Sequence, residues 1–174
     1  MNNRGFTLVE MLMYVAIMVI VGSVIVVFIP QLTRKNAYLQ AKSEVLDNMT
    51  SAMKIMEREI KHSSSIYAST TVFAVSPGQL SLETSFNTIA TENSTFVDFY
   101  VDDNRLYVKR EEQAAELLVS DKIKINSLVF TNLNAGGNYP VVRIALTASY
   151  DTASQEVAEQ SKVTLTSTVS AREY

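Results

Sequence analysis

The chain has 174 residues, a formal net charge of −3 and no cysteine. The lack of cysteine excludes a disulfide framework and a thiolate metal site. The sequence has no basic stripe of the kind that indicates nucleic-acid binding, and nucleic-acid binding is not predicted. Once an N-terminal membrane segment is set aside, the remaining length fits one folded domain.

The first predicted element is an apolar run from Met11 to Ile29 that contains no charged side chain. A helix of this length, at about 1.5 Å per residue, matches the roughly 30 Å hydrocarbon core of a bilayer. We therefore predict a transmembrane helix over residues 6–30. Glu10 stands at the start of the run, where a carboxylate is costly in hydrocarbon and usually has a partner.

Residues 1–5 form a leader that is too short for a secretory signal. In a secretory signal the small-residue cleavage site follows the apolar region, whereas here Arg4 and Gly5 precede it. A cut after Gly5 would therefore leave the whole hydrophobic helix on the mature protein.

The unbroken stretch Gly-Phe-Thr-Leu-Val-Glu, from Gly5 to Glu10, resembles the class III signal of type IV pilins and pseudopilins. The resemblance implies that a prepilin peptidase cuts between Gly5 and Phe6 and N-methylates Phe6. It also implies that Glu10, at the fifth mature position, pairs with the N-terminal amine of a neighbouring subunit during assembly. Two charges that are each costly in lipid become tolerable as a pair. The alternative is a plain signal anchor with an accidental Glu10.

The orientation of the helix follows from the same resemblance. It implies a single-pass protein of the cytoplasmic (inner) membrane, with the leader in the cytoplasm and the C-terminal domain periplasmic or otherwise extracytoplasmic. The basic residues alone indicate the opposite, because Arg34 and Lys35 follow the span and only Arg4 precedes it. The implied partners are the prepilin peptidase, other pilin or pseudopilin subunits bound through the N-terminal helix, and an inner-membrane assembly platform.

Residues 31–65 are predicted to continue as an amphipathic helix. Apolar residues at three-, four- and seven-residue steps predict one stripe that packs on the following domain; they are Leu39, Leu46, Met49, Met53, Met56 and Ile60. Pro30 lacks a backbone donor and predicts a helix kink at the membrane edge. In related pilins the stretch between a glycine and a proline can unwind in the filament, which is the alternative for residues 22–30.

Residues 66–174 are predicted to form an extracytoplasmic β-rich domain, because the apolar period changes there from helical to alternating. The predicted strands cover residues 71–75, 80–85, 96–101, 105–109, a marginal 117–120, 122–131, 141–150 and 162–170. Hairpin turns are predicted at Pro77-Gly78 and Asp102-Asp103-Asn104, and loops at 87–95, 135–138 and 151–160. A long N-terminal helix followed by antiparallel strands predicts an α+β fold, with the helix packed on one face of a sheet.

The segment from Ala52 to Ile60 resembles the Leu-Glu-Arg-Asp-Leu stretch of J-type minor pseudopilins, with Glu59 in place of the aspartate. Looser likenesses to that group occur at residues 125–130 and 140–144. The resemblance implies a minor subunit that initiates or caps a filament. Such filaments act in type II secretion, in DNA uptake by competence systems, or as type IV pili.

No catalytic residue, cofactor or metal site is predicted. His62 is the lone histidine and stands at a helix end among serines, which is typical of a solvated or capping residue. Asp102, Asp103 and Asn104 could offer oxygen atoms to calcium. A hairpin turn is favoured because no twelve-residue ligand pattern follows.

Two function classes remain from the sequence. The first is a structural subunit that inserts its helix into a filament, and it depends on Gly5, Phe6 and Glu10. The second is a single-pass, membrane-anchored binding module for DNA or a secreted substrate. Lys109-Arg110 is followed at once by Glu111-Glu112, which argues against an electropositive groove for DNA.

Overall fold

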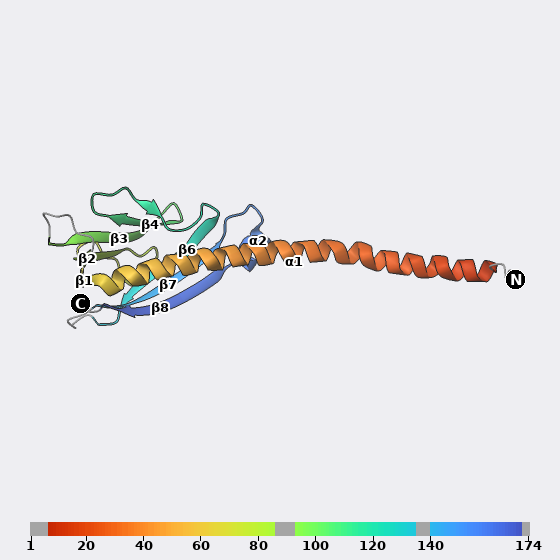
Figure 1. The fold of residues 1–174 in the computed structure, drawn as a ribbon, viewed down its shortest axis with the longest axis horizontal. Coiled ribbons are helices and arrows are strands. Elements are labelled where there is room, and N and C mark those ends of the chain that lie inside the picture. Colours follow the sequence, from red (N-terminus) through yellow and green to blue (C-terminus); the bar gives the residue numbers. More distant parts are fainter. Residues whose placement is uncertain (1–6, 86–92, 135–139, 172–174) are drawn as a thin grey trace, which may run out of the picture. The chain divides into compact units, whose positions relative to one another are not determined.

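The computed structural model describes residues 7–85, 93–134 and 140–171 (Figure 1). By its internal contacts the chain divides into two compact units, Met1–Leu39 and Gln40–Tyr174. The division falls inside one long helix, α1, which extends from Leu8 to His62. The C-terminal part of this helix therefore belongs to the same unit as the strands.

Strands and one short helix follow α1 in the described residues: β1 (Ser63–Ile66), β2 (Leu80–Thr84), β3 (Thr95–Asp102), β4 (Arg105–Arg110), β5 (Glu116–Leu117), β6 (Ile123–Asn132), β7 (Val141–Tyr150), α2 (Gln155–Gln160) and β8 (Val163–Ser170). The strands form two antiparallel sheets, ordered β1-β2-β3-β4-β5 and β6-β7-β8 (Figure 1). The predicted α+β fold is confirmed, although the strands make two sheets where one was expected. Helix α2 lies within the predicted polar loop 151–160, and residues 87–92 and 135–138 of the other two loops lie outside the described residues.

The first unit contains the apolar part of α1. Leu8–Ile29 is a segment of 22 residues with a mean hydropathy of 2.9, and none of its most apolar stretch is buried. At 1.5 Å per residue it is about 33 Å long, enough to cross a bilayer. By length and composition alone it qualifies as a membrane span, as a signal sequence would. Helix α1 continues through Pro30, and the predicted kink there stays a prediction.

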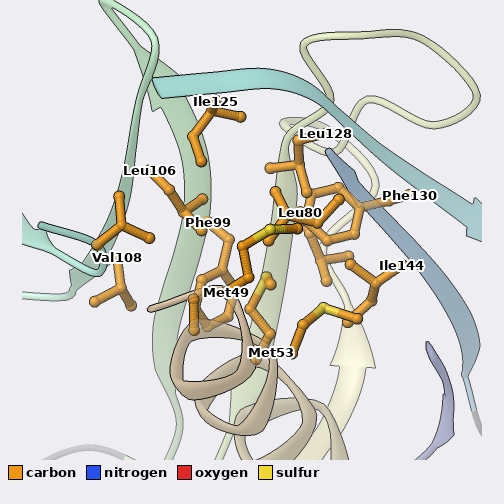
Figure 2. Packing of buried hydrophobic residues seen from close by; sticks show 14 of the residues in the cluster. Met49, Met53, Leu80, Phe99, Leu106, Val108, Ile125, Leu128, Phe130 and Ile144 are labelled. Atoms are coloured by element: carbon orange, nitrogen blue, oxygen red, sulfur yellow. The ribbon is translucent and has the colours of Figure 1, made fainter. Parts of the chain in front are cut away.

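In the second unit, α1 buries one stripe of small and medium apolar side chains. Its buried residues recur at steps of about one helical turn; they are Ala41, Val45, Met49, Ala52, Met53, Met56 and Ile60. Met49 and Met53 point into a cluster that contains residues of both sheets, among them Phe99 and Phe130 (Figure 2). One face of α1 therefore packs in a core that it shares with both sheets.

The predicted stripe was wrong for Leu39 and Leu46, which are 58% and 43% exposed. Seven residues make slightly less than two full turns, so these two leucines share a line along the helix. Val45 is fully buried, and the residue after it lies about 100° further around the helix. The buried stripe is centred near Val45, Met49 and Met56, and Leu46 lies at its edge, close to the line of the buried Met53.

The β3–β4 hairpin confirms the turn predicted at residues 102–104. Asp102 pairs with Arg105 across the ladder, so the turn itself has two residues. Asp103 and Asn104 have φ angles of 44° and 58°. Left-handed geometry at both central positions is typical of a type I′ turn, and Asp and Asn tolerate it better than most residues.

The hairpin predicted around Pro77-Gly78 is wrong. Residues 71–75 form no strand, and only a single bridge joins Val72 to Gln79. The loop instead donates to β6 of the other sheet, from Ala74 N to Phe130 O and from Gly78 N to Leu128 O, both at 2.8 Å. Backbone donors used on β6 are not free to form a ladder with β2, which pairs with β1 and β3 instead.

Polar contacts fix α1 on the first sheet. The side chain of Glu59 is 8% exposed, and its Oε1 accepts a hydrogen bond from Nη2 of Arg110 on β4 at 2.9 Å. Arg110 also reaches Glu116 of β5, at 3.4 Å. Further along the helix, Oδ1 of Asn48 accepts from the backbone N of Ser120 at 2.9 Å. The carboxylate in the segment that resembles J-type pseudopilins thus has an internal partner.

Gly78 allows the loop to approach β6 closely. A Cβ at this position would lie 3.1 Å from Leu128 O, 3.2 Å from Phe130 Cδ2 and 3.2 Å from Val75 O. Two of these neighbours are backbone atoms that cannot rotate away. A side chain here would therefore require the loop or β6 to shift by a few tenths of an ångström.

We expect Gly78→Ala to lower the free energy of unfolding of the β domain by about 1–3 kcal/mol, as overpacking does. The measurement is urea unfolding of the detergent-solubilised full chain, followed by circular dichroism of the strands. Gly22→Ala is the matched control, because nothing lies within 4 Å of a Cβ built there. An unchanged urea midpoint for Gly78→Ala would contradict the packing argument.

Candidate functional site

The predicted cleavage residues, Gly5 and Phe6, lie outside the described residues. The description starts at Thr7, and α1 begins at Leu8. Of the three residues predicted for cleavage and assembly, Glu10 is the one that the structure describes, and the site is built around it.

Thr7 is the N-cap of α1, a role that was not predicted from the sequence. Its Oγ1 accepts a hydrogen bond from Glu10 N at 3.3 Å, and its carbonyl oxygen accepts from Glu10 N at 3.1 Å and Met11 N at 3.2 Å. Thr-x-x-Glu is the residue order of a capping box, which satisfies backbone donors at a helix start. That spacing was the signal by which the role of Thr7 could have been found.

Glu10 lies in the first turn of α1 and is exposed. The positive end of the helix dipole favours a carboxylate at this position. Residues one and two turns further on the same side are the exposed apolar Met13, Tyr14 and Ile17. The carboxylate is thus placed at the edge of an apolar surface, where it can accept a cation from another molecule.

The other residues considered from the sequence have structural positions. His62 is the last residue of α1, and its carbonyl oxygen accepts a hydrogen bond from Thr84 Oγ1 at 2.9 Å. A basic residue in the last turn also complements the helix dipole. Asp103 and Asn104 form the β3–β4 turn. Among the residues that the structure describes, no three His, Cys, Asp or Glu side chains are grouped as metal ligands usually are.

Residues 1–26 match the family model described as the prokaryotic N-terminal methylation motif. The match supports a type IV pilin-like protein. It covers the predicted cleavage site, Glu10 and most of the apolar segment, and it leaves the β domain outside. Comparison of the pilin-like chain with curated proteins and with solved structures gave no match.

The matched motif and the apolar helix together support a membrane-anchored pilin-like precursor. The motif also implies processing by a prepilin peptidase and assembly with other pilins. It indicates a structural subunit rather than an enzyme.

We expect Thr7→Ala to remove about 1 kcal/mol of stability from the start of α1. Amide hydrogen exchange at Glu10 and Met11 should become about fivefold faster, measured by NMR on the micelle-bound full chain. Thr7→Ser keeps the hydroxyl and should exchange at the wild-type rate. Equal rates in Thr7→Ala and wild type would show that Thr7 does not cap the helix.

Proposed function

We propose that this pilin-like chain is a minor pilin or minor pseudopilin. It is a structural subunit that initiates or caps a type II secretion pseudopilus or a type IV pilus-like filament after leader cleavage and N-methylation. The observation that carries the proposal is an acid, Glu10, in the first turn of an apolar span within the methylation motif.

The proposed mechanism begins with cleavage after Gly5, which creates a free amine on Phe6. Methylation leaves that amine basic and able to carry a positive charge. The carboxylate of Glu10 in a neighbouring subunit then pairs with it, and the pair replaces two isolated charges that lipid disfavours. The apolar surface of α1 exchanges lipid for the helices of other subunits.

The minor-subunit assignment rests on the likeness of Ala52–Ile60 to the J-type segment. In this chain the acid of that segment, Glu59, contacts Arg110 and fixes the helix on the first sheet. This contact gives the acid a role within one subunit. The partners in this proposal are the prepilin peptidase, other pilin subunits and the inner-membrane assembly platform. The leader is cytoplasmic and the β domain extracytoplasmic.

The first test is the intact mass and N-terminal sequence of the membrane-extracted chain, with and without a co-expressed prepilin peptidase. We expect a chain that starts at N-methylated Phe6 only when the peptidase is present. Gly5→Val should block the cut, because the peptidase must approach the backbone closely at this residue. A chain that still starts at Met1 beside an active peptidase would instead favour a membrane-anchored binding module.

The second test separates the charge of Glu10 from its place in the helix cap. Glu10→Ala should leave processing intact and lower incorporation into filaments by about tenfold or more, since an unpaired amine would be left in apolar surroundings. Glu10→Gln keeps a capping-box residue but removes the charge, and should fail equally.

The readout is the amount of processed chain in sheared filaments relative to the membrane fraction. If Glu10→Gln assembles normally while Glu10→Ala does not, Glu10 acts through the helix start and the charge-pairing mechanism is wrong. Normal assembly of both variants would remove Glu10 from the mechanism altogether.

A further inference from the structure

A cleft of about 370 Å³ opens in the β domain beside the turn of the β3–β4 hairpin. Its walls are residues 76–77 of the loop before β2, the hairpin residues Val101, Asp103 and Asn104, and residues 125–128 of β6. It therefore lies where parts of the two sheets meet. Its volume is within the range of pockets that bind small ligands or single side chains.

Backbone hydrogen bonds hold these walls together. Ile125 N donates to Asn104 O at 2.8 Å, and Gly78 N donates to Leu128 O at 2.8 Å. Nη1 of Arg105, next to the turn, donates to Ile123 O at 2.5 Å. The loop and the hairpin are thus both tied to β6, and the cleft is formed before any ligand arrives.

A β-bulge supplies one of the polar groups at the rim. The register of β6 against β7 shifts between Ile125, which pairs with Ala148, and Ser127, which pairs with Thr147. Asn126 is the extra residue, and its side chain is exposed. Bulges commonly re-aim a side chain in this way.

The cleft has both apolar and polar lining. Ile125 and Leu128 are 3% and 0% exposed and belong to the hydrophobic core (Figure 2), so the apolar lining that a ligand can reach is Pro77 and Val101. The rim carries amide and hydroxyl groups together with Asp103, which is the only charged side chain among the residues that line the cleft. Asp103 has no ion pair within residues 7–85, 93–134 and 140–171.

This combination favours a ligand with an apolar stem and a cationic head. A single carboxylate disfavours anions such as phosphates and attracts a positive charge. Arginine side chains lay their methylene groups on apolar surface and keep the guanidinium at the polar edge. The planar guanidinium has five donors, which suit a carboxylate surrounded by amide and hydroxyl oxygens better than a point charge does.

We propose that this cleft binds an arginine side chain of a partner protein, with Asp103 as the acceptor of the guanidinium and Pro77 and Val101 beside its stem. The inference uses only the β domain and is independent of the methylation motif. It adds a protein-recognition site to the pilin-like chain, distant in sequence from Glu10.

The test uses N-acetyl-arginine amide as the probe and N-acetyl-citrulline amide as its uncharged isostere. Each is titrated into the isotopically labelled full chain in zwitterionic micelles, and amide shifts are followed by NMR. We expect saturable shifts at Asn104, Ile125 and Ser127 with the arginine probe, and about tenfold weaker binding of citrulline.

Asp103→Asn removes the charge and keeps a residue that tolerates the left-handed turn. It should weaken arginine binding about tenfold. The amide chemical shifts of β4 should stay at their wild-type values, which would show that the hairpin keeps its fold. Asp102→Asn is the matched control, since it removes the same charge from the adjacent residue, which does not line the cleft, and it should bind as wild type does.

Three outcomes would overturn the inference. They are citrulline binding as tightly as arginine, Asp102→Asn weakening binding as much as Asp103→Asn, and calcium chloride producing shifts that the arginine probe fails to produce. The last result would identify the rim as a cation site. None of these results bears on cleavage at Gly5 or on Glu10.

Discussion

The packing of one stripe of α1 against both sheets is the contact on which the β domain depends. Neither sheet is closed on itself, and each needs a cover for its apolar face. Met49 and Met53 lie in a cluster with residues of both sheets, and flexible methionine side chains suit such an irregular junction. The ion pair of Glu59 and Arg110 adds direction to this contact, because a non-directional apolar stripe alone would let the helix rotate.

The sequence predicted the elements whose pattern is local. Residues 141–150 alternate cleanly and form β7 with the predicted bounds, and the Asp-Asn turn joins β3 to β4 as expected. The exposed Leu46 and the absent strand at 71–75 were missed because their outcomes depend on distant partners. Leu46 lies at the edge of the buried helix face, and the donors of the 71–79 loop are used on β6, far along the chain.

The candidate site divides in the same way. The order of Gly5, Phe6 and Glu10 is a short local motif, and the match of residues 1–26 to the methylation model agrees with it. The capping role of Thr7 was missed although the Thr-x-x-Glu spacing of Thr7 and Glu10 is a local signal for it. The cleft beside Asp103 was beyond the reach of sequence reasoning, since its walls come from three separated segments that only the tertiary fold brings together.

The loop that closes the edge of β6 has a further consequence for how this surface can vary. Its donors, Ala74 and Gly78, are four residues apart, whereas their acceptors, Phe130 and Leu128, are two apart. Residues 75–77 therefore arch outward and are exposed. Evolution can change the length and chemistry of this arch while both anchoring bonds and the core beneath persist. The fold thus separates an anchored support from an exposed rim, whose length and chemistry can change at little cost in stability.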